Sequence, residues 1–313
     1  MSSVLQNDYF RVTICGAGKV GMTAAYALLL SGFAQEITLF GRHLDKLQGE
    51  KLDLEHAMAL SHKTKISITD KYEDLAGTDV FVFCAGAAQN PGDTRLDLAS
   101  KNLSIVDQMA PQLLEAAPEA ILLMVANPVD LMTYRAQELI NARPGQIFGS
   151  GTLLDTARFR FHLSESLPVT SRSIHAYVLG EHGDHSFPVY SSATIGGQKM
   201  LDFPGFSFEQ AQSAYQKARD AAYAIIESKG ATYYGIGASI VKIVRSIWRD
   251  SQSVLPLSTV LYDYYGQSQM AASVPCILGR TGIQQVLKVD LNESEQAALA
   301  AGVAALKDVY SSV

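Results

Sequence analysis

A glycine-rich turn between a strand-like and a helix-like stretch constrains the fold of this chain more than any other feature. The run Gly16-Ala17-Gly18-Lys19-Val20-Gly21 follows the apolar stretch 11–15 and precedes the Ala- and Leu-rich stretch 20–30. In such a unit the first Gly permits a tight turn, the second lets a pyrophosphate approach the backbone, and the third lets helix and strand pack closely. The start of the helix offers free N–H groups to phosphate. The pattern predicts a dinucleotide-binding turn, and a purely structural turn is the alternative.

The alternation of strand-like and helix-like stretches continues through the first half of the chain and then changes. Short apolar runs at 11–15, 36–40, 65–68, 80–84 and 120–126 alternate with helical patterns, which predicts a parallel sheet covered on both faces. After about residue 150, long helical patterns are mixed with strand-like runs, at 173–179, 187–190, 193–195, 254–262 and 273–278. We therefore expect an α/β protein with a doubly wound Rossmann dinucleotide-binding domain over 1–149. A mixed α+β substrate domain is expected over 150–313.

The composition excludes several classes of protein. Among the 313 residues, 31 acidic and 25 basic side chains give a net charge of −6, and no block of Lys and Arg is available to neutralise nucleic-acid phosphates. No apolar run approaches the roughly 20 residues that cross a bilayer. The first ten residues lack the basic start and apolar core of a secretory signal. Three scattered cysteines and the lack of a metal-ligand cluster complete the expectation of a cytoplasmic protein with no metal, membrane or nucleic-acid partner.

The predicted second strand ends without the acidic residue that usually binds the adenosine ribose. Phe40 is followed by Gly41 and Arg42, where a carboxylate is expected about 20 residues after the glycines. A carboxylate would bond the ribose hydroxyls and repel a 2′-phosphate, whereas Gly41 does neither and Arg42 offers a cation. We therefore predict raised acceptance of NADP(H) beside NAD(H). The alternative is that Arg42 points to solvent and water holds the ribose.

Four polar clusters follow predicted strands or share a helix face. The Gly- and Pro-containing loop 86–95 ends in Arg95, and Asn127 follows the fifth strand. Asp155 and Arg158, three residues apart, face the same side of a helix, and His182 lies in a tight polar loop. Such groups suit the reduction of a small 2-keto acid, in which His exchanges a proton, a carboxylate orients it and arginines bind the anionic substrate. Each of these residues taken alone is more often structural.

Together these strings resemble the lactate/malate dehydrogenase family, and within it the bacterial L-lactate dehydrogenases. The resemblance extends from Gly16 through the run 149–158 to the run 229–232. It implies NAD(H) as cofactor, a cis peptide bond between Asn127 and Pro128, and reversible reduction of pyruvate to L-lactate. The implied catalytic residues are His182 as proton donor and acceptor, Asp155 as its orienting partner, and Arg95. The implied substrate-binding residues are Gln89, Arg95, Asn127, Arg158 and Thr232. The cofactor-binding candidates are Gly16, Gly18, Val20, Gly21, Gly41, Arg42, Ala85, Gly86 and Asn127.

Gln89 decides between the substrates of this family. The family's malate enzymes carry an arginine at this position, which pairs with the second carboxylate of oxaloacetate. A neutral Gln89 leaves that carboxylate without a partner, and burying an unpaired carboxylate in a closed site weakens the binding of oxaloacetate. We therefore predict pyruvate and L-lactate. Malate or a bulkier 2-hydroxy acid is the alternative, and a non-catalytic nucleotide-binding homologue is a second alternative from another class.

Two further residues bear on regulation. Arg160 lies two residues beyond Arg158 and so points away from the proposed active site, and His175 lies on the following strand. In bacterial L-lactate dehydrogenases these positions form a fructose 1,6-bisphosphate site shared between subunits. The resemblance therefore implies an allosterically activated homotetramer or dimer, in which the anion relieves repulsion between paired cations. A pair of solvated surface cations is the alternative.

Overall fold

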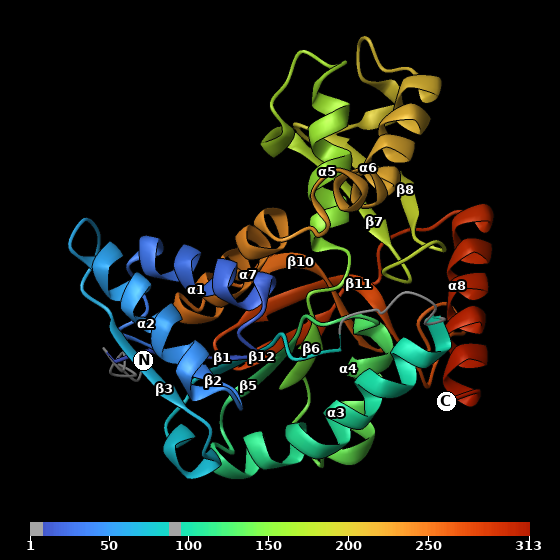
Figure 1. Ribbon diagram of the computed structural model, residues 1–313. Helices are drawn as coiled ribbons and strands as arrows, with labels where there is room; N and C mark the ends of the chain where they lie inside the picture. Colours follow the sequence, from blue (N-terminus) through green and yellow to red (C-terminus); the bar gives the residue numbers. More distant parts are fainter. Residues whose placement is uncertain (1–8, 88–94) are drawn as a thin grey trace, which may run out of the picture.

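The computed structural model describes residues 9–87 and 95–313 and contains a large twisted sheet with a smaller lobe above it (Figure 1). The large sheet has the strand order β12-β11-β10-β6-β5-β4-β1-β2-β3. Its parallel part consists of β1 (Arg11–Cys15), β2 (Glu36–Phe40), β3 (Lys65–Thr69), β4 (Val80–Phe83), β5 (Ile121–Met124) and β6 (Ile147–Gly149). This is the strand order of a Rossmann fold, and it confirms the predicted fold class.

Helices cover both faces of the parallel strands, which explains why β4 and β5 are apolar at every position. In Figure 1, α1, α2 and α7 lie above the sheet, and α3 and α4 lie below it. The residues of β2, β4 and β5 are all buried. A strand buried on both faces has no reason to alternate polar with apolar residues. These helices are α1 (Lys19–Ser31), α2 (Leu44–Met58), α3 (Arg95–Ala116), α4 (Val129–Leu139) and α7 (Tyr234–Trp248).

Three strands from the second half of the chain extend the large sheet. They are β10 (Ser253–Val260), β11 (Ala271–Gly279) and β12 (Gly282–Val286), all antiparallel to their neighbours. Strand β10 joins the parallel part through β6, where Ser258 pairs with Gly149. The sequence predicted strands in this region but not their sheet partner. The large core is consequently continuous across residues 149 and 150.

The smaller lobe has its own sheet and core. Strands β7 (Ile174–Leu179), β8 (Phe187–Ile195) and β9 (Gln198–Lys199) pair antiparallel and pack with α5 (Leu153–Ser164) and α6 (Phe208–Lys229). The two strand-like runs expected at 187–190 and 193–195 are one strand, because the backbone continues extended between them. Helix α6 presents a stripe of small residues, Ala211, Ala214 and Ala218, to this core. The lobe thus holds α5 and α6 beside the carboxyl ends of the large sheet.

The last helix closes the chain against the smaller lobe. Helix α8 (Glu293–Ser311) begins with a capping box, in which the side chains of Asn292 and Glu295 accept hydrogen bonds from each other's backbone N–H groups. The buried Glu295 carboxylate also accepts hydrogen bonds from the backbone N–H groups of Tyr190 and Ser191 on β8. This side chain therefore ties α8 to the strand that follows the His182 loop. No helix of the described residues is long and apolar enough to span a membrane.

Candidate active site

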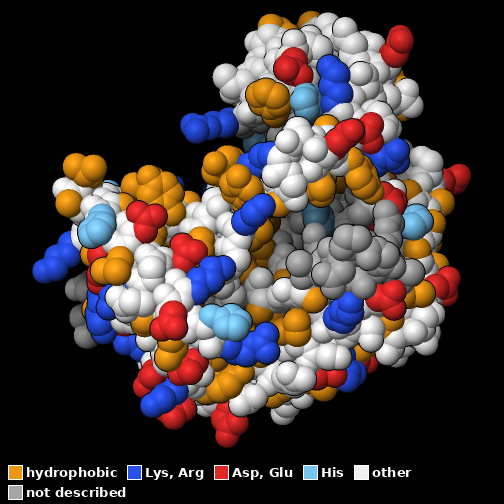
Figure 2. Space-filling view, in the orientation of Figure 1, with side chains coloured by type: hydrophobic (Ala, Val, Ile, Leu, Met, Phe, Trp, Pro, Cys, Tyr) orange, Lys and Arg blue, Asp and Glu red, His pale blue; other side chains and the backbone are white. Residues whose placement is uncertain are grey.

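A cavity of about 300 Å³ lies where the smaller lobe meets the carboxyl ends of the large sheet. Figure 2 shows a hollow on this face of the molecule. Ligands of open α/β sheets bind at this edge, because the strand order reverses there and leaves a crevice. The cavity wall includes six of the residues singled out from the sequence, which are Val20, Asn127, Asp155, Arg158, His182 and Thr232. The structure therefore brings together residues from five separate segments of the chain.

The glycine turn after β1 fits a dinucleotide. Gly16 adopts a positive φ of 104°, and a Cβ there would lie 2.8 Å from the backbone nitrogen of Ala85. A Cβ on Gly21 would lie 2.1 Å from the Gly16 carbonyl oxygen, so helix and turn are in direct contact. Above Gly18, by contrast, a Cβ would meet no described heavy atom within 4 Å. Since Gly18 caps α1 without a side-chain bond, the first N–H groups of the helix remain available to a phosphate.

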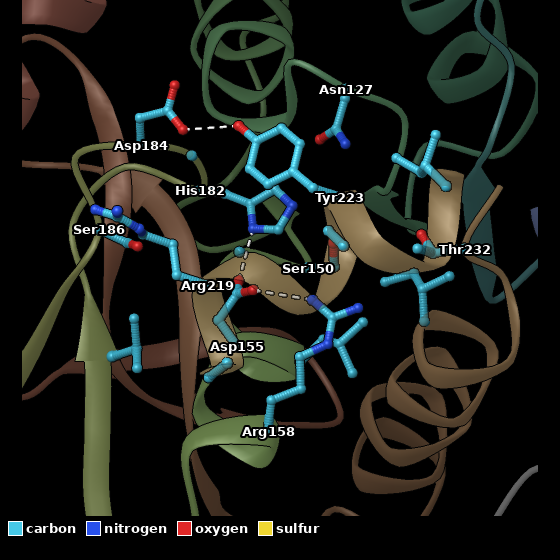
Figure 3. Close-up of a pocket in the computed structure, with 18 of the residues that line it drawn as sticks. Asn127, Ser150, Asp155, Arg158, His182, Asp184, Ser186, Arg219, Tyr223 and Thr232 are labelled. Carbon is cyan, nitrogen blue, oxygen red and sulfur yellow. Dashed lines mark hydrogen bonds and ion pairs between the residues drawn. The ribbon is translucent and has the colours of Figure 1, made fainter. Parts of the chain in front are cut away.

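The Asp155 carboxylate joins the two charged side chains of the site. Its Oδ2 atom accepts a hydrogen bond of 2.7 Å from His182 Nδ1, and its Oδ1 atom lies 3.3 Å from Arg158 Nη1 (Figure 3). Asp155 and Arg158 lie one turn apart on α5, as their spacing predicts. Because Asp155 occupies Nδ1, the other ring nitrogen of His182, Nε2, is the one that can exchange a proton with a ligand.

This contact shifts the pKa values of both partners. Burial alone would lower the pKa of His182, but the Asp155 carboxylate outweighs it and raises that pKa to about 9. Burial would likewise raise the pKa of Asp155, but the His182 ring and the Arg158 guanidinium hold it below its ordinary value. The pair is therefore an imidazolium beside a carboxylate at neutral pH. A protonated histidine in a cavity is suited to act as a general acid.

Asp130 is a site residue that the sequence reasoning missed. It is 2% exposed, and its Oδ2 atom accepts the backbone N–H of His182 at 2.7 Å. Its Oδ1 atom accepts the Ser258 hydroxyl at 2.5 Å. Burial raises the pKa of Asp130 to about 6, although both hydrogen bonds lower it. A buried carboxylate thus fixes the backbone of the His182 loop and places a second negative charge close to the imidazolium.

A hydrogen-bonded asparagine pair fixes the segment after β5. The Asn127–Pro128 peptide bond is cis, which confirms the expectation drawn from the family resemblance. Asn102 on α3 donates to the Asn127 carbonyl at 2.6 Å and accepts the backbone N–H of Ala87 at 2.7 Å. The backbone after β4 and the backbone after β5 are therefore held together at the cavity. The Asn127 side chain remains directed at the cavity that it lines (Figure 3).

Two tyrosines tie α6 to the loop 180–186, which carries His182. Tyr223 donates to Asp184 Oδ1 at 2.8 Å, and Tyr215 donates to the Ser186 carbonyl oxygen. All four side chains line the cavity, together with Arg219 from the same face of α6. The sequence reasoning assigned no role to any of them. A polar stripe at helical spacing on an otherwise Ala-rich helix was the signal available.

Several predicted site residues lie away from this cavity or outside the described residues. Gly41 and Arg42 follow β2, whose last residue Phe40 accepts the Gly16 N–H, and Arg42 is exposed. Arg160 donates from Nε to the Ala176 carbonyl at 2.7 Å on β7, where His175 is exposed. Gln89 and the side chain of Arg95 lie outside the described residues. Ala85 and Gly86 follow β4 beside the glycine turn.

Comparison with known proteins identifies the family of this site. The family model for the lactate/malate dehydrogenase NAD binding domain matches residues 10–149, and the model for the lactate/malate dehydrogenase alpha/beta C-terminal domain matches residues 152–313. The chain belongs to the lactate/malate dehydrogenase family. The family description and the glycine turn agree that the first half of this dehydrogenase binds NAD.

Individual members of the family are similar over nearly the whole chain. The L-lactate dehydrogenase of Latilactobacillus sakei strain 23K is 40% identical over 311 residues, which are 98% of this chain and 95% of that protein. L-lactate dehydrogenase 1 of Enterococcus faecalis is 40% identical, covering 96% and 93% of the two chains. The solved structure of the minor L-lactate dehydrogenase from Enterococcus mundtii, in a ligand-bound form, has a TM-score of 0.94 at 34% identity and covers 98% and 99% of the two chains.

Proposed function

We propose that this protein is an L-lactate dehydrogenase that reduces pyruvate reversibly to L-lactate with a nicotinamide cofactor. The observation that carries the proposal is one carboxylate, Asp155, that contacts both His182 and Arg158 inside one cavity. L-lactate dehydrogenases at about 40% identity over nearly the full chain support the same activity. Measurement of NADH oxidation with pyruvate tests it. A His182→Asn variant that retains full turnover would contradict it and favour a non-catalytic nucleotide-binding protein.

The residues of the cavity divide the reaction between them. When bound, the cofactor supplies the hydride. His182 donates its Nε2 proton to the carbonyl oxygen as that oxygen gains negative charge, and Asp155 stabilises the imidazolium before transfer. Arg158 binds the substrate carboxylate, for which its planar pair of N–H groups fits two oxygens. Asn127 bonds the substrate oxygen and Thr232 lines the pocket.

Two residues before and at the start of α3 complete the proposed substrate site. We assign to Arg95 the polarisation of the substrate carbonyl and to Gln89 the choice of pyruvate over oxaloacetate. The support is the family resemblance and the neutral charge of Gln89, which leaves a second carboxylate without a partner. Rates with pyruvate, oxaloacetate and 2-oxoisocaproate test the choice, and pyruvate should be the best substrate. Gln89→Arg should move the preference toward oxaloacetate, and an unchanged preference would remove Gln89 from this role.

For the cofactor, we propose that NADP(H) is accepted beside NAD(H). A Cβ on Gly41 would meet only Leu47, at 3.8 Å, among the described residues. The missing carboxylate is therefore not excluded by lack of space, and its loss removes the usual repulsion of a 2′-phosphate. The exposed Arg42 offers a cation beside it. The ratio of kcat/KM for NADH and NADPH is the test, and a preference for NADH above about a thousandfold would contradict the proposal.

We further propose a homotetramer or dimer activated by fructose 1,6-bisphosphate through Arg160 and His175. The hydrogen bond from Arg160 to the carbonyl of Ala176 places the guanidinium next to the residue that follows His175. The effector should lower the KM for pyruvate in the wild-type protein and not in Arg160→Gln. Arg172→Gln, an exposed arginine of the same lobe, is the matched control. An unchanged KM with millimolar effector would contradict regulation at this site.

We also propose that the two halves of the chain are domains with different binding roles. We assign dinucleotide binding to residues 1–149 and substrate binding to residues 150–313. The extents of the two family models, 10–149 and 152–313, support this division. The antiparallel strands β10, β11 and β12 belong by sequence to the second part and by hydrogen bonding to the sheet of the first. The division is not complete, because the first part also contributes a proposed substrate-binding residue, Asn127, to the cavity that Arg158 lines.

A further inference from the structure

A lysine bridges the glycine turn and the helix that follows β2. The Nζ atom of Lys46, on the first turn of α2, donates to the carbonyl oxygen of Ala17 at 2.9 Å. The glycine turn is also bonded to the end of β2, because the Gly16 N–H donates to the Phe40 carbonyl at 3.1 Å. The Lys46 ammonium therefore lies beside the glycine turn, which is itself bonded to the end of β2. In a Rossmann unit the adenosine ribose binds beside the end of the second strand.

The surroundings of Lys46 leave its charge uncompensated. Its hydrogen-bond partner is a neutral carbonyl, and no ion pair joins it to an acidic side chain of the described residues. An ammonium has three donors, of which the bond to Ala17 uses one. Arg42 and Lys46 are both exposed, and Asp45 is the acidic residue of this helical turn. Arg42 directly follows Gly41, and Lys46 reaches the glycine turn, so two cations lie on the segments that border the expected ribose position.

We propose that Lys46 is a specificity-determining residue which, with Arg42, binds the 2′-phosphate of NADP(H). The proposal rests on the proposed acceptance of NADP(H) and extends it by naming the second cation of the phosphate site. A phosphate monoester carries close to two negative charges at pH 7 and three oxygens, so two cations and several donors suit it better than one. The bond to Ala17 holds the ammonium in place before the ligand arrives, which limits the side-chain entropy lost on binding.

A purely structural role for Lys46 makes a different prediction. If the side chain only clamps the glycine turn, its loss weakens binding of NADH and NADPH by the same factor, since both place a pyrophosphate on that turn. If it binds the 2′-phosphate, only NADPH is affected. The informative quantity is therefore the ratio of the two dissociation constants, measured without substrate and independent of turnover.

The experiment is a fluorescence titration of the full-length protein with NADH and with NADPH. Lys46→Met should raise the Kd for NADPH about tenfold, the value of one exposed charge-assisted hydrogen bond, and change the Kd for NADH less than about twofold. Lys46→Arg should retain wild-type binding of NADPH. Lys51→Met is the matched control, because it removes the same charge from the same helix, where Lys51 pairs with Glu55 at 3.6 Å. This control should change neither constant.

The possible outcomes separate the role of Lys46 from the proposed function. Equal changes in both constants, or no change, in Lys46→Met would overturn the role of Lys46 while leaving NADP(H) acceptance in place. A wild-type protein that binds NADH more than about a thousandfold more tightly than NADPH would overturn both. Titration with adenosine 2′,5′-bisphosphate and adenosine 5′-monophosphate, which differ only by the 2′-phosphate, repeats the comparison without the nicotinamide. Reduction of pyruvate with NADH is measured separately, and it tests the proposed dehydrogenase activity independently of the role of Lys46.

Discussion

Replacement of Asp155 by Asn should move the pH at which pyruvate reduction fails. Reduction requires protonated His182, whose pKa is about 9, so kcat/KM for pyruvate should fall as the pH rises through about 9. The rise of this pKa from 6.5 to about 9 corresponds to about 3 kcal/mol of preferential stabilisation of the imidazolium. Without the carboxylate, the burial that lowers this pKa is opposed only by Asp130. In Asp155→Asn, kcat/KM for pyruvate should therefore begin to fall at or below the pH range in which histidine ordinarily titrates.

The size of the effect follows from the protonated fraction. At pH 8 that fraction drops from about nine-tenths at a pKa of 9 to about one-thirtieth at 6.5, so reduction should slow about thirtyfold from this cause alone. Lactate oxidation, which needs neutral His182, should lose less. Glu165→Gln removes an exposed carboxylate that contacts His162 on the same helix at 2.8 Å and should leave the profile unchanged. A pH profile of Asp155→Asn that matches the wild type would refute this account of the pair.

Substitutions at three other positions test the stability of the fold, the placement of the His182 loop and the selectivity for the cofactor. Glu36, buried on β2, has a pKa of about 2, because the hydroxyl and cationic donors around it outweigh the effect of burial. The ionised carboxylate therefore contributes about 3 kcal/mol to the free energy of unfolding, which is present above pH 4.5 and lost as the pH falls toward 2. Glu36→Gln should remove most of it at pH 7 and flatten the acid dependence of urea unfolding. A Cβ on Gly302 would lie 3.4 Å from His185, so Gly302→Ala should keep turnover whereas Gly302→Leu should displace the His182 loop and lower kcat. An aspartate at position 41 fits beside Leu47, so Gly41→Asp should raise the ratio of kcat/KM for NADH to that for NADPH at least tenfold, or about 1.4 kcal/mol. An unchanged ratio would show that this position does not determine cofactor selectivity.

The parallel part of the sheet was predictable because its signals are local. Strand β4 (Val80–Phe83) is buried at every position, and a short apolar run with helical patterns on both sides leaves few alternatives. The partner of β10 was not predictable in this way. Its last six residues are all buried, so it is covered on both faces, but this does not say that it pairs with β6. That pairing joins Ser258 to Gly149, which are far apart in the sequence.

The same distinction between local and distant information applies to the site. Asp130 lies in the first turn of α4, soon after β5, yet its partner Ser258 lies 128 positions later on β10. No spacing rule connects the two. The role of Asp130 therefore becomes visible only when the antiparallel extension of the sheet brings Ser258 beneath the His182 loop. The residue was overlooked for the same reason that the pairing of β10 was.

The orientation of His182 toward Asp155 depends on contacts that have no catalytic chemistry of their own. Thr152 and Thr156 both donate to the Val178 carbonyl, at 2.6 and 3.2 Å, and Thr156 also accepts the Val178 N–H at 2.9 Å. These buried hydroxyls hold the start of α5 against the end of β7, on either side of Asp155 in the sequence and a few residues before His182. A sequence can reveal a candidate histidine and a candidate carboxylate, but their separation of 2.7 Å depends on hydrogen bonds such as these between α5 and β7. Because the rise in the His182 pKa arises from that contact, the acid of the reaction depends on the packing of α5 against β7 as much as on its own identity.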